Sequence, residues 1–219
     1  MPEPALPHHT ALEHLRIIRT LMERANIYRA VSATAALTGG LLAMAVAYYG
    51  VQGEGKRAEE HLGARGFLLL WLSVLMVSGL ANLVLLMREA GGKGQPFLSD
   101  GLRMALRAIV PPLLTGGVFG ICLIWFESRV ELATLIWIVC YGLALQGTVS
   151  FAPKSIIHLA RAFLVTGQVL TVIWFWRGAF LFTNPVVEAS ALMGLTFGLF
   201  HVVYAVAVFA SKPKEAGNA

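Results

Sequence analysis

The stretch GLTFGLFHVVYAVAV, residues 194–208, has no acidic or basic side chain apart from one histidine, His201. It lies in a longer run without Asp, Glu, Lys or Arg that extends from Ala189 to Ser211. Because a helix needs roughly 20 apolar residues to cross the hydrocarbon core of a bilayer, the run predicts a transmembrane helix. An ionisable ring inside such a helix is costly unless it faces the interior of a bundle. We therefore expect His201 to point inward.

The rest of the chain has the same character. Hydrophobic residues make up 57% of the 219 residues and charged residues 13%, about half the charged share of a soluble domain. The sequence predicts an all-α, polytopic membrane protein with six transmembrane helices in residues 28–211. We expect these spans at about residues 30–50, 66–87, 108–126, 132–152, 155–176 and 187–211.

The basic residues indicate the orientation of the spans. Most Lys and Arg residues lie before the first span, between spans two and three, between spans four and five, and after the sixth. Positive charge gathers on the cytoplasmic side, so both termini of this multi-pass protein are predicted to be cytoplasmic. The net charge of +5 does not indicate a nucleic-acid partner, because the charges fall in the gaps between apolar runs.

Residues 10–27 have the pattern of an amphipathic interfacial helix. Thr10 and Glu13 form a capping-box pair, and Leu15, Ile18 and Met22 follow at helical spacing. Such a helix lies in the headgroup plane, either as a simple anchor or as a docking surface for a cytoplasmic protein, which the basic loops would extend. Residues 1–9 are expected to be a flexible start and residues 212–219 a cytoplasmic tail.

Short similar stretches recur in alternate spans. Near their cytoplasmic ends, spans one, three and five contain RAVSATAALTGG from Arg29, RAIVPPLLTGG from Arg107 and RAFLVTGQ from Arg161. Spans two, four and six contain GLANL, GLALQ and GLFHV. An internal repeat of three helical hairpins explains the pattern; chance recurrence of common membrane residues is the alternative.

The same stretches contain polar residues at similar depths from the cytoplasmic side. They are His201, Asn82, Gln146, Thr38, Thr115, Thr166 and Gln168. Polar side chains inside a membrane bond across helices, so we expect a polar belt in which the His201 ring bonds to a Thr, Asn or Gln. A ligand site is the alternative. His158 lies at a similar depth, and His158 with His201 could ligate haem.

The sequence does not point to an enzyme or to an ion-driven carrier. No charged residue is expected inside a span, although ion-coupled carriers place carboxylates there, and no hydrolase or metalloprotease motif occurs. We expect a non-enzymatic sensory or scaffolding module, and no cofactor is predicted. The alternatives are a small channel or facilitator for a neutral solute, and a haem- or quinone-binding electron carrier. The sequence is also compatible with association of the chain into a homo-oligomer.

Four stretches together resemble an uncharacterised family of bacterial six-span membrane proteins. They are LEHLRIIRTLMERANIYRAVS at 12–32, LRAIVPPLLTGG at 106–117, WIVCYGLALQGTVS at 137–150 and MGLTFGLFHVVYAV at 193–206. The resemblance implies a plasma-membrane location and six spans, and it implies no activity. After the serine of the third stretch the chain reads FAPKS, where the family pattern has a basic Val-Arg pair, so no role of that pair is carried over.

Overall fold

The computed structural model describes residues 13–18, 32–52, 63–92, 100–178 and 182–211, and in these ranges every regular element is a helix. The all-α prediction is therefore confirmed. After a helical stretch at 13–18, the elements are α2 (Ala33–Val51), α3 (Ala64–Gly92), α4 (Asp100–Glu127), α5 (Val130–Gln146), α6 (Lys154–Arg177), α7 (Pro185–Met193), the π-helical segment η2 (Gly194–Phe200) and α8 (His201–Ser211).

Among the described residues, five helices are long and apolar enough to cross a membrane. They are α2, α3, α4, α6 and the continuous run of α7, η2 and α8 from Pro185 to Ser211. The apolar α5 is shorter, with 17 residues. Large apolar side chains such as Phe126 and Trp176 are 75% and 85% exposed, which suits lipid rather than water. These features indicate a multi-pass membrane protein.

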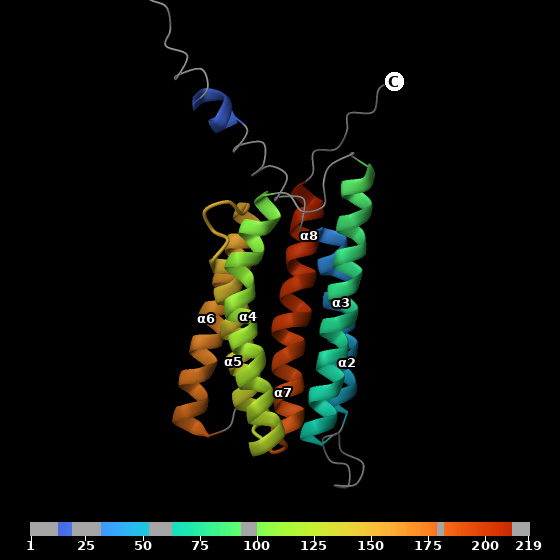
Figure 1. Ribbon diagram of the computed structural model, residues 1–219. Helices are drawn as coiled ribbons and strands as arrows, with labels where there is room; N and C mark the ends of the chain where they lie inside the picture. The colour runs from blue at the N-terminus through green and yellow to red at the C-terminus, as the bar shows by residue number, and fades with distance from the viewer. Residues whose placement is uncertain (1–12, 19–31, 53–62, 93–99, 179–181, 212–219) are drawn as a thin grey trace, which may run out of the picture.

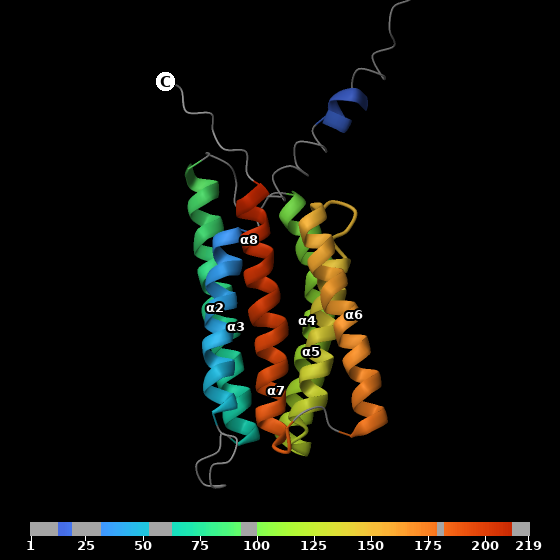
Figure 2. The ribbon, with the colours of Figure 1, turned by 180° about the vertical axis from the view of Figure 1, so that it is seen from behind.

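The helices run up and down in one bundle (Figure 1). The run α7–η2–α8 lies in the middle, with α2 and α3 on one side and α4, α5 and α6 on the other (Figures 1 and 2). We name the end at which α2 ends and α3 begins the outer end, and the opposite end, where α2 begins and α8 ends, the inner end.

Small residues on α2 allow the last helix to pack closely. The buried face of α2 consists of Ala33, Ala36, Gly40, Ala43, Ala47 and Gly50, and it lies against α7, η2 and α8. A Cβ atom added at Gly40 would lie only 2.9 Å from the carbonyl oxygen of Gly198. Close backbone approach over small residues is a common way in which membrane helices associate.

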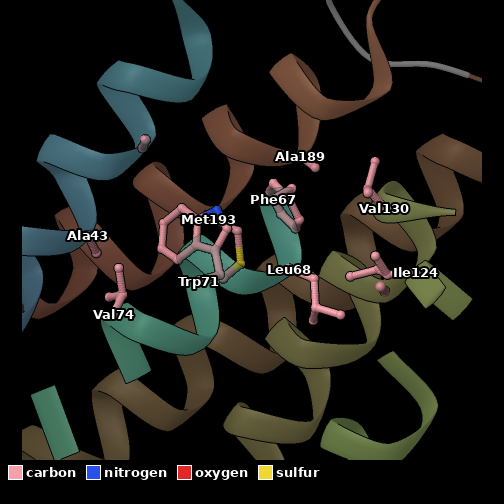
Figure 3. Packing of buried hydrophobic residues seen from close by; sticks show 11 residues of the cluster. Ala43, Phe67, Leu68, Trp71, Val74, Ile124, Val130, Ala189 and Met193 are labelled. Atoms are coloured by element: carbon pink, nitrogen blue, oxygen red, sulfur yellow. The ribbon is translucent and has the colours of Figure 1, made fainter. Parts of the chain in front are cut away.

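The buried core has two parts. The part nearer the outer end joins α2, α3, α4, α5 and α7, and Figure 3 shows Trp71 beside Met193 within it. The second part joins α2, α5, α6, α7 and α8 around Phe163. Trp71 is only 4% exposed and the half-buried Trp137 donates to the Gly116 carbonyl at 3.0 Å. These two indoles therefore belong to the core of the bundle.

Two helix ends differ from the expected spans. The third span begins earlier, because α4 starts at Asp100 and continues through Pro111 and Pro112; a membrane helix tolerates proline when neighbours supply partners for the freed backbone groups. The fourth span ends earlier, because α5 stops at Gln146 and the chain turns there, with the Thr148 hydroxyl donating to the Leu145 carbonyl.

The connections also differ from a simple set of three hairpins. The helices α4 and α5 are antiparallel neighbours joined at Ser128, whose φ of 56° reverses the chain. However, α2 packs chiefly against the last span and α6 chiefly against α5.

Of the amphipathic helix expected at 10–27, residues 13–18 are helical, and its remainder lies outside the described residues, as do residues 1–9 and 212–219.

Candidate functional site in the last span

The last span contains the seven-residue π-helical segment η2, which ends directly before His201. Its glycines face α2: an added Cβ would lie 2.5 Å from the Ala47 Cβ at Gly194 and 2.6 Å from the Met44 Cγ at Gly198. π-helical segments are rare and often occur at functional sites. The two glycines let this wider backbone stay in contact with α2.

The His201 ring is half-buried and both of its nitrogens have partners. Nδ1 lies 2.8 Å from the Phe197 carbonyl oxygen inside η2, and Nε2 lies 2.7 Å from the Tyr141 hydroxyl on α5. A carbonyl oxygen can only accept a hydrogen bond, so Nδ1 carries the hydrogen. In the neutral ring Nε2 is then the acceptor and the Tyr141 hydroxyl is the donor. This contact links α5 to the start of α8.

Aromatic rings surround this contact. The Tyr141 ring lies 4.7 Å from Phe163 of α6 and 5.1 Å from Phe197, measured between ring centroids. Phe163 is fully buried and also contacts Phe200 at 5.4 Å. Edge-on aromatic pairs of this kind add to the stability that burial provides. We call Tyr141, Phe163, Phe197, Phe200 and His201 the aromatic cluster.

The sequence did not identify the partner of His201. We expected a Thr, Asn or Gln, and the structure has a tyrosine instead. One signal was present: Trp137 and Tyr141 lie one turn apart on α5, in the third of the four stretches that carry the family resemblance. Each uses its polar atom to bond to a different helix, α4 for Trp137 and α8 for Tyr141.

The other residues of the expected polar belt do not converge on His201. Thr38, Thr115 and Gln168 are exposed, and the two threonine hydroxyls donate to carbonyls of their own helices, Thr34 and Pro111. Asn82, Gln146 and Thr166 are half-buried. Within the ranges that the structure describes, no hydrogen bond joins two members of the belt. A common depth therefore did not produce a common site.

His158 and His201 are not arranged as haem ligands. His158 is exposed on α6, and both nitrogens of His201 are already in hydrogen bonds, so neither has a free lone pair directed at a metal. In the described part of the chain, no group of three or more His, Cys, Asp or Glu side chains could hold a metal ion. Cys122 and Cys140 are free thiols.

The spans contain charged residues, so the expectation that they contain none is wrong. Arg107 lies in α4 and Arg161 in α6, and one acidic residue is buried near the start of the last span. The last span begins at Pro185, and Glu188 in its first turn is 3% exposed. Its carboxylate accepts a hydrogen bond from the Phe182 backbone N–H at 3.4 Å. An acidic residue in the first turn is favoured by the helix dipole. Glu188 thus stabilises the outer end of the span and not a path at its middle.

Comparisons with models of protein families, with curated proteins and with solved structures found no match for this chain.

Proposed function

We propose that this chain is a non-enzymatic, six-span protein of the bacterial inner membrane that acts as a sensory or scaffolding module, with both termini cytoplasmic. In this proposal the apolar helix α5 also crosses the membrane, as the fourth of six spans. Its length of 17 residues supports this because it reaches the lower end of the length that crosses a bilayer. The proposal includes kinship with the uncharacterised six-span family that the sequence resembles.

The π-helical segment with its histidine carries the sensory part of this proposal. A π-helix has more residues per turn than an α-helix, so a change of η2 to α-helix would rotate α8 about the helix axis relative to α7. Such a rotation would take His201 away from Tyr141. The last span could thus exist in two arrangements, and α8 ends at Ser211 directly before the proposed cytoplasmic tail.

The exposed residues of the polar belt give no comparable support to a channel. Thr38, Thr115 and Gln168 lie on the outside of the bundle, where they cannot line a path through it.

The proposal is tested by capturing partners in cells. A tagged full-length chain is treated with a cleavable lysine cross-linker in membranes, and the proteins that co-purify are compared for the wild type, a variant lacking residues 1–26, and Tyr141→Phe. We expect a specific cytoplasmic or membrane partner whose capture falls without residues 1–26 and changes with Tyr141→Phe. Unchanged capture in both variants would contradict the proposal. Vesicles that contain the protein and become permeable to small polyols would favour the channel instead.

A further inference from the structure

The outward face of α6 carries a regular row of exposed side chains. The helix lies at the edge of the bundle (Figures 1 and 2). Its exposed residues Lys154, His158, Arg161, Val165, Gln168, Val172 and Phe175 recur at alternating steps of four and three. This spacing, about 3.5 residues per repeat, is the spacing with which one helix packs along another. The opposite face of α6, with Gly167 and Leu164, is already occupied by α5.

Gln168 lies in the middle of this row, at the depth where a polar group has the fewest partners. At 1.5 Å per residue it is about 10 Å from Arg161 and about 14 Å from Arg177 along the helix. Its neighbours Val165, Val169 and Val172 are 60%, 51% and 68% exposed. Lipid tails cannot accept or donate a hydrogen bond, so an exposed carboxamide there lacks hydrogen-bond partners in the surrounding lipid.

Hydroxyl groups on the lipid-facing surface form hydrogen bonds within their own helices, and Gln168 does not. Thr38, Ser73 and Thr115 are exposed and each donates to a carbonyl of its own helix. Among the described residues, Gln168 has no hydrogen-bond partner. It therefore needs a partner from outside the chain.

We propose that the α6 face is a homodimer interface, in which α6 packs in parallel against α6 of a second copy and the two Gln168 carboxamides bond to each other. A carboxamide has both donors and an acceptor, so it is complementary to itself. Two copies in one membrane are related by an axis along the membrane normal, which brings identical residues of parallel helices together. In the part of the row from Val165 to Phe175, Gln168 is the one polar residue among apolar ones. Such a residue sets the register of a helix pair.

Arg161 lies on the same face, and it does not oppose this pairing. It is about two turns nearer the inner end than Gln168. Its long side chain can extend to the headgroups while the aliphatic part stays against the helix. The proposal depends on α6 crossing the membrane, and it does not depend on the sensory role.

The first test measures association in vesicles. Donor- and acceptor-labelled full-length protein is diluted with lipid, and energy transfer gives the dimer dissociation constant for the wild type, Gln168→Leu, Gln168→Asn and Thr115→Val. We expect Gln168→Leu to weaken the dimer by roughly 3- to 30-fold, the range for interhelical hydrogen bonds. Gln168→Asn keeps a carboxamide and should lose less. Thr115→Val, on α4, should have no effect.

The second test locates the interface by disulfide formation. In a chain in which Cys122 and Cys140 are replaced by Ala, Val172→Cys should form a disulfide-linked dimer under mild oxidation. Val118→Cys, which is 60% exposed on α4, should not. A monomeric wild type in vesicles, a Gln168→Leu dimer as tight as the wild type, or cross-linking through α4 and not α6 would each overturn the proposal. So would a wild type that is monomeric when pure and cross-links through α6 only to another protein.

Discussion

Removing the Tyr141 hydroxyl isolates the contact between α5 and the last span. Tyr141→Phe keeps the ring, which packs 4.7 Å from Phe163 and 5.1 Å from Phe197. It removes the 2.7 Å hydrogen bond to His201 and leaves Nε2 of that ring without its donor. The half-buried site then contains an unpaired acceptor.

The expected loss of stability follows from this geometry. Hydrogen bonds between membrane helices contribute about 0.6 kcal/mol on average and about 1.7 kcal/mol at most, and an unpaired buried acceptor costs about 1–3 kcal/mol. Because the ring is only half-buried, we expect the free energy of unfolding to fall by about 1–2 kcal/mol. The matched control is Tyr48→Phe, since Tyr48 on α2 is 69% exposed, and it should change the stability by less than about 0.5 kcal/mol.

The measurement is reversible unfolding in mixed micelles with increasing SDS, followed by circular dichroism. A double-mutant cycle with His201→Leu isolates the pair, and we expect a coupling energy of about 0.6–1.7 kcal/mol. The reasoning is refuted if Tyr141→Phe is as stable as Tyr48→Phe, or if the two substitutions in the cycle are additive. Either result would mean that the hydroxyl and the ring do not interact.

The remaining predictions concern helix packing, a helix end and the topology. Gly40→Ala should lower the free energy of unfolding by about 1–3 kcal/mol, the cost of overpacking, because the new methyl group would meet a backbone carbonyl at 2.9 Å. Gly79→Ala, with nothing within 4 Å, should instead raise it by up to about 1 kcal/mol through helix propensity; equal effects in SDS unfolding would contradict the packing. Asn184→Ala should lower it by about 1 kcal/mol, because the Asn184 side chain accepts from two backbone N–H groups of the last span, and an unchanged unfolding curve would exclude this capping role. The topology is tested in a chain without its native cysteines, with a thiol reagent that does not cross membranes. Glu127→Cys should react with it in intact cells, whereas Ser150→Cys should react only after the cells are opened. The reverse pattern would exclude the proposed orientation.

The positions of the helices could be read from the sequence to a large extent. The apolar runs are long and their ends are marked by charges, so α2, α6 and the last span begin and end close to the expected residues. The inward position of the His201 ring also followed from the cost of an ionisable group in lipid. The ends of α4 and α5 were less predictable, because Pro111 does not interrupt α4 and the apolar residues after Gln146 turn instead of continuing the helix.

The composition of the site could not be read in the same way. Thr38 and Thr115 have the depth of His201 along their helices, but they face away from the centre. Depth follows from counting residues, whereas direction depends on how each helix is rotated against its neighbours. The sequence could not identify Tyr141 as the partner of His201 for the same reason, because the separation of two residues along the chain does not indicate which helices pack together.

The sequence by itself determined that the chain is helical and that its helices suit a membrane, because hydrophobic length and charge are properties of each segment alone. Only the tertiary structure decided that α2 packs on the last span, that residues 194–200 form a π-helix whose glycines face α2, and that Tyr141 bonds to His201. Apolar helices have no intrinsic preference among apolar neighbours in lipid. Their pairing is decided by the fit of small residues, aromatic rings and a few hydrogen bonds, and that fit exists only after the helices have come together.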